Sequence, residues 1–505
     1  MRVKNFVKVG TTLLFATGML AACGNSKSSS ATDKDSNSAS TKKTVTWTTM
    51  LHTPTAPSGD VQSKLEKYTG MKIKFSWVPD ASKDEKINAA LASKSLTDVT
   101  SLTDISNATV RKAMKSGMFW DVEKYLKDYP NLAKISKKTI NASKIDGHLY
   151  GVPYVKPMAR YGILIRQDWL DKLGLKAPKN VNDLTKIAQA FTEDDPDGDG
   201  KKDTVGFVER NESFNVGFRS ITGYFGAGNQ FAVVKGKVIP SFMQSGYKDA
   251  MKFYRNIYKN GWMNSDFSVM AKQDQKNYIA QGKGGIVVSG LMEASNYVAA
   301  AKGTPQENKM KWLLVNDLKG TNGKRTTLSD TNGGMGGWLA ISKQSVKSVK
   351  DLKAVLKFID KLSDKKPYVW MTEGIEGQHY SLNSKGEYTI TNETKWEQEV
   401  QPFASSRPSE TVANLKFTDP LKNEQQEKIA DNGKYAVINP AQSLSSDTYD
   451  AQWSTLIEPI QDVYYKYMMG QNSMKDWDAA VKTFRSSGGD QVIKEFTASY
   501  KKAND

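Results

Sequence analysis

Patterns typical of strands and helices alternate between residues 45 and 102 of this chain. Three segments have the apolar alternation or the short apolar run of a strand: residues 45–50, 71–78 and 98–102. Two segments between them have helical spacing: residues 60–68 and 84–92. This βαβαβ run predicts a parallel sheet covered by helices. The loops after its strands, residues 52–58 and 103–107, should lie at the carboxyl edge of the sheet, where such folds bind ligands.

The folded part is too long for one small core. About 460 of the 505 residues follow residue 43, and a chain of this length suits two lobes. The hydrophobic content of 38% and the aromatic content of 10% are typical of a globular body. We therefore expect an α/β fold with two lobes, each built on a mainly parallel sheet flanked by helices.

The N-terminus has the features of an export signal. Arg2, Lys4 and Lys8 form a positive region, and the apolar stretch of residues 11–22 is too short to span a membrane. Residues 20–24 read LAACG, which resembles the lipobox of bacterial lipoproteins. The resemblance implies removal of residues 1–22 and attachment of a diacylglyceryl group to Cys23, which supplies enough acyl chain for stable anchoring.

Two further features agree with an anchored surface protein. Cys23 is the only cysteine in the chain, so no internal disulfide is possible. Residues 23–43 contain no large apolar side chain and are expected to form a flexible tether. We expect the protein on the outer face of the cell membrane, at a Gram-positive cell surface.

The chain is strongly basic. Its formal charge of +17 falls to +14 without the three cationic residues of the leader. A basic body can bind nucleic acid, an anionic envelope or an acidic ligand. The lysines are scattered and no arginine-rich run occurs, so nucleic acid is not an expected partner. We interpret the charge as solvated surface in an anionic wall, with an acidic sugar ligand as the alternative.

Five motifs occur in a characteristic order. They are residues 146–154 (DGHLYGVPY), 161–175 (YGILIRQDWLDKLGL), 278–290 (YIAQGKGGIVVSG), 334–343 (GMGGWLAISK) and 374–380 (GIEGQHY). Together with Pro178 and a helix start at Asn182 or Asp183, they resemble the sugar-type extracellular solute-binding proteins of ABC transporters. The resemblance covers the body from residue 44 onward and extends to the calcium-containing alginate- and oligosaccharide-binding members.

The resemblance implies a periplasmic-binding-protein-like fold of type II, in which two lobes close over a ligand. We expect the first lobe to comprise residues 44–157 with 336–366, and the second lobe residues 158–335 with 367–505. The family implies that an oligosaccharide is captured and delivered to the permease subunits of an ABC importer. We expect a monomer, because lobe closure and docking to the permease require free surfaces.

A metal-binding pattern occurs between residues 195 and 203. Asp195, Asp197, Asp199 and Asp203 occupy positions one, three, five and nine of a calcium loop, and Gly200 occupies position six. The Lys201 carbonyl would supply position seven. Position twelve is Gly206 instead of the bidentate glutamate of an EF-hand. We therefore expect a structural Ca²⁺ rather than a regulatory one; the alternative is an acidic loop that binds nothing.

The residues that contact the sugar are harder to predict. Sugar sites combine aromatic platforms with charged or amide hydrogen-bonding groups. On this basis the candidates are His52, Asp104, Tyr154, Arg160, Tyr224, Glu293, Trp338, His379, Arg407 and Trp453. For each of them a structural role is the competing interpretation: Tyr154 and Trp453 could be packing residues, and Arg160 or Arg407 could form an ion pair between the lobes.

Catalytic and nucleotide-binding motifs are missing from the sequence. It contains no Walker motif, HExxH, GxSxG or catalytic-cysteine arrangement, and its three histidines are far apart. The sequence therefore predicts a binding protein without an organic cofactor, and not an enzyme. A peptide or another solute remains an alternative ligand. A surface glycosidase also stays open, since 54 acidic residues always offer a pair of carboxylates. So does an adhesin or sensor subunit.

Overall fold

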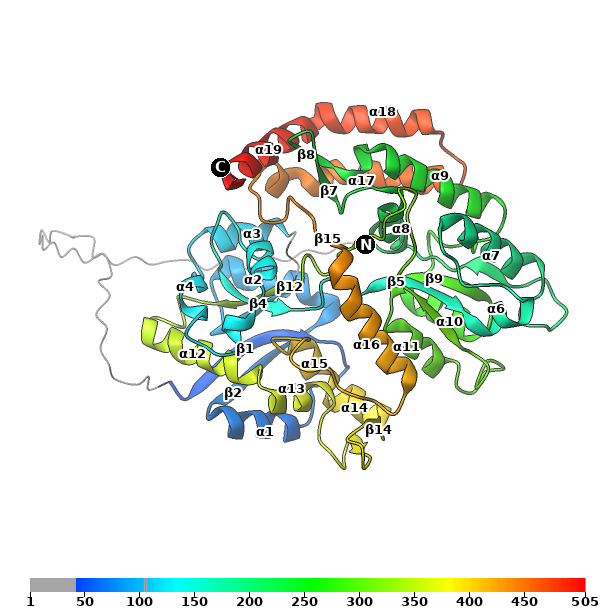
Figure 1. The fold of residues 1–505 in the computed structure, drawn as a ribbon. Coiled ribbons are helices and arrows are strands. Elements are labelled where there is room, and N and C mark those ends of the chain that lie inside the picture. Colours follow the sequence, from blue (N-terminus) through cyan, green and yellow to red (C-terminus); the bar gives the residue numbers. More distant parts are fainter. Residues whose placement is uncertain (1–41, 104, 106, 505) are drawn as a thin grey trace, which may run out of the picture. The chain divides into compact units, whose positions relative to one another are not determined.

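The computed structural model describes residues 42–103, 105 and 107–504, all of which belong to one unit of the chain (Figure 1). The predictions for Cys23 and Asp104, and those for residues 1–41, lie outside the described residues. The βαβαβ run is confirmed as β1 (Thr44–Leu51), α1 (Gly59–Thr69), β2 (Lys72–Pro79), α2 (Lys83–Ser93) and β3 (Val99–Leu102). β1 pairs in parallel with both β2 and β3.

The described residues contain two main sheets. The first has the order β2-β1-β3-β12-β4, completed by β12 (Met335–Ile341) and β4 (Gly151–Val155). The second has the order β10-β5-β9-β6, with β10 (Trp312–Val315), β5 (Tyr161–Arg166), β9 (Gly284–Gly290) and β6 (Val205–Phe207). Three two-stranded pairs are smaller: β7 (Phe231–Val234) with β8 (Lys237–Pro240), β11 (Thr327–Leu328) with β15 (Ala436–Val437), and β13 (Tyr380–Leu382) with β14 (Tyr388–Ile390).

Both main sheets are mixed rather than mainly parallel. β12 runs antiparallel to β3 and β4, and β5 runs antiparallel to β9 and β10, whereas β6 and β9 are parallel. The reason is the chain path: β4 leads directly into β5 of the other sheet, and β12 brings the chain back. Strands that enter a sheet from the crossing side run opposite to its βαβ strands. The α/β class itself is confirmed.

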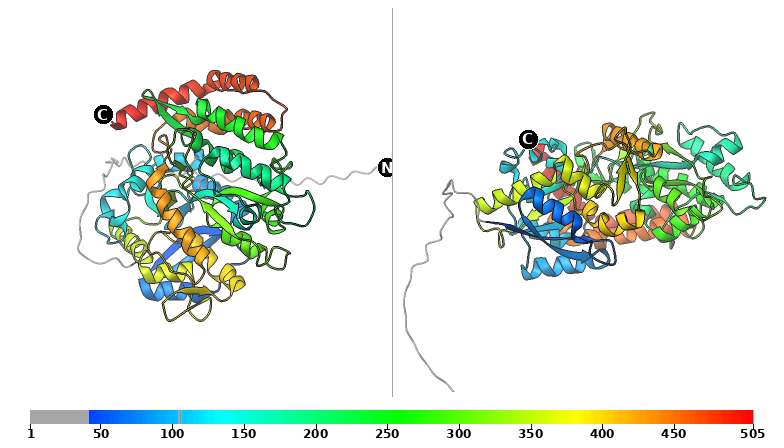
Figure 2. Two further views of the ribbon diagram at one scale, coloured as in Figure 1. Left: turned by 45° about the vertical axis from the view of Figure 1, so that its right-hand side comes forward. Right: turned by 90° about the horizontal axis from the view of Figure 1, so that it is seen from below.

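Helices cover the faces of both sheets (Figures 1 and 2). Those that follow first-sheet segments of the chain are α3 (Ala108–Lys115), α4 (Glu123–Leu126), α5 (Lys137–Ala142), α12 (Val349–Leu362), α13 (Lys365–Thr372), α14 (Glu393–Glu399) and α15 (Gln401–Ser406). The others are α6 (Gln167–Leu173), α7 (Val181–Glu193), α8 (Gly217–Thr222), α9 (Ser245–Lys259), α10 (Lys272–Ala280), α11 (Glu293–Ala300), α16 (Pro420–Asn432), α17 (Asp447–Met468), α18 (Met474–Phe484) and α19 (Asp490–Asn504). The helix predicted to start at Asn182 or Asp183 is capped by Asn180, whose side chain accepts from both of their N–H groups.

Each main sheet separates two layers of core. Along β5, Ile163 and Ile165 point into one cluster and Leu164 into the other, as the period of two in a strand requires. β12 divides in the same way: Leu339 lies on one face and Trp338 on the other. Because both faces are covered, these strands are almost continuously apolar, which explains why they stand out in the sequence.

The predicted boundary of the first lobe at residue 366 is not where the core changes. Met371 and Ile375, at and beyond the end of α13, lie in the same cluster as Val45 and Trp47 of β1, and so does Phe403 of α15. Thr49 on β1 also shares a hydrogen bond with Ser406, between Oγ1 and Oγ (2.8 Å). Residues of α13 and α15 therefore pack in the core of the first sheet, whereas the prediction assigned them to the second lobe.

Candidate functional site

The carboxyl ends of the strands of both sheets meet where the chain crosses between them. β4 ends at Val155 and β5 begins at Tyr161, which pairs with Gly290, the last residue of β9. On the return, Met335 at the start of β12 pairs with Val155. In α/β folds ligands bind at this edge of the sheet, because the loops after the strands converge there. We call this region, residues 156–160 and 329–334, the crossing.

Hydrogen bonds join the two passages of the chain through the crossing. Arg160 donates from its backbone N–H to Asp330 Oδ1 (2.7 Å) and from Nε to Oδ2 (2.8 Å). Ser329 Oγ donates to the Met158 carbonyl (2.6 Å), and Thr331 Oγ1 donates to the Pro157 carbonyl (2.6 Å). The Asp330 side chain is only 4% exposed. Arg160, predicted as a ligand contact, thus forms an ion pair, but its partner Asp330 belongs to the same predicted lobe (residues 158–335), so the pair is not the contact between lobes that the sequence left open.

A cavity of about 1080 Å³ adjoins the crossing and shares Lys156, Pro157, Met158 and Arg160 with it. Its wall combines residues from both groups of helices. The aromatic lining residues are Tyr368, Tyr388, Trp396 and Phe417. The charged lining residues are Lys134, Lys156, Arg160, Lys276, Glu373, Glu393, Glu397, Arg407, Glu410, Asp419 and Lys422. Aromatic faces among charged hydrogen-bonding groups are the combination that sugars require.

The charges near the crossing are arranged around Glu410. Its carboxylate lies 3.6 Å from Lys156 Nζ. Burial alone would raise the pKa of Glu410, but Arg407, Lys156 and Arg160 together hold it below its ordinary value. Arg407 also lies over the Tyr368 ring, 6.0 Å from its centroid, and its buried Nε has no hydrogen-bond partner among the described residues. The predicted residue Arg407 therefore faces this cavity with hydrogen-bonding capacity to spare.

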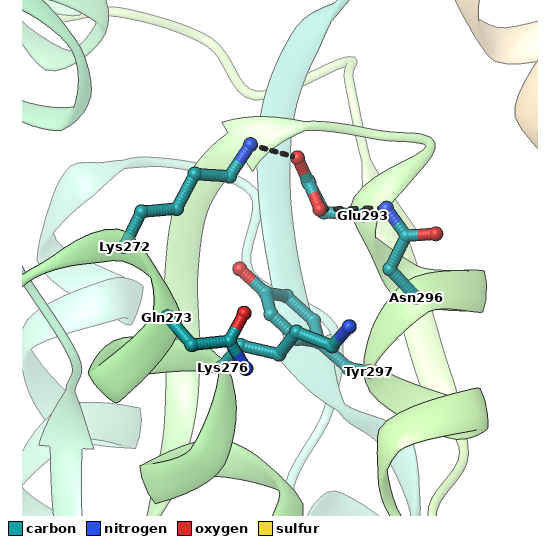
Figure 3. A pocket seen from close by; sticks show the side chains of 6 residues that line it. All are labelled: Lys272, Gln273, Lys276, Glu293, Asn296 and Tyr297. Atoms are coloured by element: carbon teal, nitrogen blue, oxygen red, sulfur yellow. Dashed lines mark hydrogen bonds and ion pairs between the residues drawn. The ribbon is translucent and has the colours of Figure 1, made fainter. Parts of the chain in front are cut away.

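A second pocket of about 330 Å³ lies between α10 and α11 and contains the predicted residue Glu293 (Figure 3). Lys272 Nζ lies 2.9 Å from Glu293 Oε1, and Asn296 Nδ2 donates to Oε2 (2.8 Å). Burial alone would raise the pKa of Glu293, but the hydrogen bond from Asn296 and the charge of Lys272 outweigh this effect and hold the pKa below its ordinary value. Lys276 and Asn296 line both this pocket and the large cavity, which makes the two neighbours.

Five predicted ligand residues lie in or against the core instead. Tyr154 is buried, and its hydroxyl shares a hydrogen bond with Ser101 Oγ (2.6 Å). Trp338 is 2% exposed and donates from Nε1 to the Ser143 carbonyl (2.8 Å), so it presents no face to a sugar. His379 is fully buried between the Ile375 N–H and the Glu399 carboxylate. Each of these three side chains therefore has a structural role here, which is the competing interpretation that the sequence left open.

Tyr224 and Trp453 complete this group, and His52 differs from it. Tyr224 is 4% exposed in the largest core cluster. Trp453 packs against the rings of Phe231 and Tyr449, with centroids 5.2 and 4.9 Å away. His52 is exposed beyond β1, with Nδ1 3.8 Å from Asp80 Oδ2. Of the described candidates, only Arg160, Glu293 and Arg407 line one of the two cavities.

Sequence reasoning missed two arginines near the crossing. Arg210 follows β6; it donates from Nε to Glu212 Oε2 (2.7 Å) and from Nη1 to Gln275 Oε1 (2.9 Å). Arg219 lies on α8 and is partly buried. Both residues act on the pKa of Tyr161, as does Arg160. No pattern in the sequence marks them, since α8 is short and no contact along the chain links it to β5.

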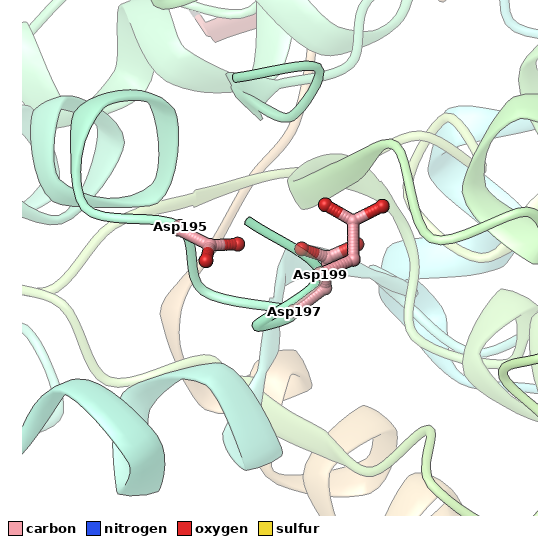
Figure 4. A group of neighbouring side chains, drawn as sticks. All are labelled: Asp195, Asp197 and Asp199. Atoms are coloured by element: carbon pink, nitrogen blue, oxygen red, sulfur yellow. The ribbon is translucent and has the colours of Figure 1, made fainter. Parts of the chain in front are cut away.

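The predicted metal loop brings three carboxylates together. One oxygen from each of Asp195, Asp197 and Asp199 lies within 4.8 Å of the other two (Figure 4). Asp195 accepts from the N–H groups of Gly198 and Gly200 (3.0 and 3.1 Å). These glycines have φ angles of 76° and 79°, which L side chains rarely adopt. The loop is thus folded so that the carboxylates converge.

The donor set of this loop fits a hard cation. Asp197 Oδ1 is buried and has no hydrogen-bond partner among the described residues. Burial, Asp195 and Asp199 all raise the pKa of Asp197, as expected for a carboxylate that shares a small space with two others. Lys201 Nζ pairs with Asp199 Oδ2 (2.7 Å) at the edge of the group. Ca²⁺ binds oxygen ligands of this kind. Asp203, predicted at position nine, is not part of the converging group.

The structure also explains the departure at position twelve. Gly206 lies in β6, and a Cβ there would be 2.5 Å from the Cα of Ala188 and 2.6 Å from its carbonyl oxygen, in α7. A glutamate therefore cannot occupy this position, because strand and helix backbones are in contact.

Comparison with known proteins places the chain in a family. Residues 54–368 match the bacterial extracellular solute-binding protein family, and the chain belongs to it. It is 38% identical over 489 residues to the polygalacturonan/rhamnogalacturonan-binding protein YtcQ of Bacillus subtilis (strain 168), covering 96% of both chains. It is 34% identical over 499 residues to lipoprotein LipO of the same organism, covering 97% of both.

Solved structures show the same fold. The alginate-binding protein AlgQ2, determined without calcium ion, superposes with a TM-score of 0.66 at 20% identity, covering 92% of this chain and 99% of that one. An EF-hand mutant of the substrate-binding protein FusA of Streptococcus pneumoniae, in complex with fructo-nystose, gives 0.65 at 20% identity and covers 92% and 100%. The fold is therefore the two-lobed fold of solute-binding proteins. The relatives are solute-binding proteins and not enzymes.

Proposed function

We propose that this protein captures an oligosaccharide outside the cell and delivers it to the permease of an ABC importer. The observation that carries the proposal is the crossing, where the carboxyl edges of both sheets meet beside a cavity lined by aromatic and charged residues. Such a wall suits the apolar faces and hydroxyl rings of sugars. The names of YtcQ and of the FusA complex, each a saccharide binder, support the same ligand class.

We propose revised lobe boundaries that follow the core. The first lobe would comprise residues 44–157 with 336–417, and the second lobe residues 158–335 with 418–505. The revision moves residues 367–417 to the first lobe, because α13 and α15 share its core and Leu415 packs with Tyr368 of α13. The crossing then holds the positions where the backbone can change when the lobes close and exclude water from the ligand.

Ca²⁺ is the proposed ion of the loop at residues 195–203. Asp195, Asp197 and Asp199 would hold it, with the Lys201 carbonyl and Asp203 as further ligands predicted from the sequence. Bound calcium supplies positive charge that neutralises the carboxylates and holds the loop after α7. The FusA structure, described as an EF-hand mutant, supports a loop of this kind in the family.

The calcium proposal is tested by stability. Calcium should raise the midpoint of thermal unfolding of the wild type, and a chelator should reverse the effect, because an ion that binds only the folded state stabilises it by mass action. Asp197→Asn should remove most of this response and leave the midpoint in chelator nearly unchanged. Asp249→Asn, an exposed acid outside the loop, is the control. An equal calcium response in Asp197→Asn and the wild type would contradict the assignment.

Attachment through Cys23 is also a proposal. The lipobox-like sequence and the similarity to lipoprotein LipO support it. Within the described part of the chain, no helix is both long enough and apolar enough to cross a membrane. Residues 1–22 would be the leader and residues 23–43 the tether, with the protein on the outer face of the membrane. Metabolic labelling with a palmitate analogue should mark the wild type and not Cys23→Ser.

The oligosaccharide itself is tested by thermal unfolding of the lipid-free chain from residue 24 against a saccharide panel and a peptide panel. A ligand that binds the native state raises the midpoint. A shift with one saccharide class, returned chemically intact, is the expected result. A shift with peptides alone would contradict the saccharide as the ligand, but the protein would still be a solute-binding protein. A saccharide returned cleaved would instead indicate an enzyme.

A further inference from the structure

Arg219 has a charge without a counter-ion. Its Nε is buried and has no hydrogen-bond partner, and its guanidinium forms no ion pair with the part of the chain that the structure describes. Burial lowers the pKa of this guanidinium, and Asp330 and Tyr161 offset that only in part. A desolvated cation without a partner costs free energy, and buried charges in proteins are normally paired, so a ligand anion is a candidate partner for this one.

The position of Arg219 is defined by the elements that converge at the crossing. Its helix, α8, packs against β9 and β11. β9 ends at Gly290, the partner of Tyr161, and β11 ends two residues before Asp330. Arg219 therefore lies beside the carboxyl edge of the second sheet, where a ligand is expected.

The carboxylates of the neighbourhood are already engaged. Both oxygens of Asp330 accept from Arg160. Glu212 accepts from Arg210. Glu209, the other acid near Arg210, accepts from Ser213 Oγ (2.9 Å) in the core below. Within each of the ion pairs Arg160–Asp330 and Arg210–Glu212 the charges cancel. The positive charge of Arg219 therefore has no carboxylate of its own.

The phenol of Tyr161 marks the centre of this group. Burial and Asp330 raise its pKa, while Arg160, Arg210 and Arg219 each lower it. Three guanidinium groups thus lie close enough to act on one hydroxyl. An anion placed beside it would be attracted by all three, and Arg219 is the one of them without an ion pair of its own.

We propose that Arg219 binds a carboxylate of the ligand, and that the ligand is therefore an acidic oligosaccharide containing uronic acid. This inference rests on the proposed function, whose ligand could equally be neutral. A guanidinium holds a carboxylate through two parallel N–H···O bonds, which neutral sugars cannot accept in the same way. The basic charge of the chain, +17, would also favour the approach of an anionic chain.

The test compares two ligands that share one sugar skeleton and differ in the charge of their carboxyl groups, which the ester caps with methyl. Trigalacturonate and its methyl ester have the same rings and hydroxyls, so calorimetry on the lipid-free wild type isolates the carboxylates. The acid should bind about 10- to 100-fold more tightly than the ester, the range of one or two charge-assisted hydrogen bonds. Higher ionic strength should weaken the binding of the acid and leave the binding of the ester unchanged.

Variants then assign the effect to Arg219. Arg219→Gln should lose most of the preference for the acid, and Arg219→Lys, which keeps the charge but loses the fork, should recover part of it. Lys302→Gln removes one exposed positive charge elsewhere and should behave as the wild type. Circular dichroism checks that each variant is folded.

Three results would overturn the inference. They are equal binding of acid and ester by the wild type, binding of neutral fructooligosaccharides with no binding of either galacturonide, and full discrimination retained by Arg219→Gln. All three leave the proposed function intact. No binding of any saccharide, acidic or neutral, would overturn the proposed function as well.

Discussion

At the residue scale, the buried carboxyl of Glu209 is the clearest case of a polar group held against its solvation. It is 4% exposed and accepts from Ser213 Oγ (2.9 Å) and weakly from the Arg210 N–H (3.3 Å). Burial is the largest influence and raises the pKa of Glu209 to about 7. Ser213 Oγ in turn shares a hydrogen bond with the Tyr464 hydroxyl (3.0 Å), which links the loop after β6 to α17.

Glu209→Gln is expected to stabilise the protein at pH 8 and to have little effect at pH 4. The unfolded carboxyl loses its proton near pH 4.5, whereas the folded one keeps it to about pH 7. Between these values the native state binds more protons, so the stability of the wild type falls as pH rises. The difference corresponds to about 3 kcal/mol above pH 7, which glutamine, having no charge, does not lose.

Urea unfolding at the two pH values measures the effect directly. A stability difference between variant and wild type that is the same at pH 4 and pH 8 would show that Glu209 ionises normally. Ser213→Ala is a useful companion, because it removes a hydrogen bond to the carboxyl and leaves the burial.

At the element scale, close approach of backbones fixes several glycines. Gly206 in β6 is the sharpest example, since the nearest atoms to an added Cβ belong to the backbone of α7 and cannot rotate away. The same contact sets the end of the metal loop. Strand, loop and helix are therefore one unit, in which the packing of α7 on β6 determines where the carboxylates of residues 195–199 lie.

Gly206→Ala should lower the free energy of unfolding by about 1–3 kcal/mol, the usual cost of forcing one carbon into a packed contact. It should also weaken the proposed calcium response, because moving β6 away from α7 moves the loop. Gly59→Ala is the control for the conformational effect of glycine, since its Cβ would meet nothing within 4 Å and its φ is not positive. Equal stability of Gly206→Ala and the wild type would mean that the strand can shift freely.

At the scale of the whole body, a buried ion pair joins the cores of the two sheets. Arg111 on α3 belongs to a helix packed on the first sheet, and α17 packs on the second. Arg111 Nε donates to Asp450 Oδ1 (2.5 Å) and Nη2 to the Leu444 carbonyl (3.2 Å), while Lys115 Nζ lies 2.7 Å from Asp450 Oδ2. One carboxylate thus holds two cations across the lobes.

Asp450→Asn should lower the free energy of unfolding by about 3 kcal/mol, because the buried Arg111 keeps its charge and loses its carboxylate. Asp447→Asn is a matched control: its carboxylate is 99% exposed and 3.8 Å from Lys115, so it should change stability by no more than about 0.5 kcal/mol. Similar values for the two variants in urea unfolding would show that the contact between α3 and α17 does not couple the lobes.

The sequence by itself determined the local structure of this protein and the class to which it belongs. The βαβαβ run, the apolar strands and the convergence of the aspartates at residues 195, 197 and 199 depend on spacings of a few residues, which side-chain period and turn chemistry set directly. The order of the family motifs was legible for the same reason, because doubly covered strands such as β5 and β9 are continuous apolar runs.

Tertiary structure alone decided which polar residues meet. Trp338 and His379 carry side chains suited to a sugar, but their neighbours in space bury them, and no pattern along the chain reveals those neighbours. Arg219 is the opposite case, because nothing in the sequence marks the short helix α8 that carries it. Only the packing of α8 on β9 and β11 brings this residue to the crossing. Contacts such as Trp338 with Ser143 and Arg160 with Asp330 join residues more than a hundred positions apart, and these exist only once both sheets have formed.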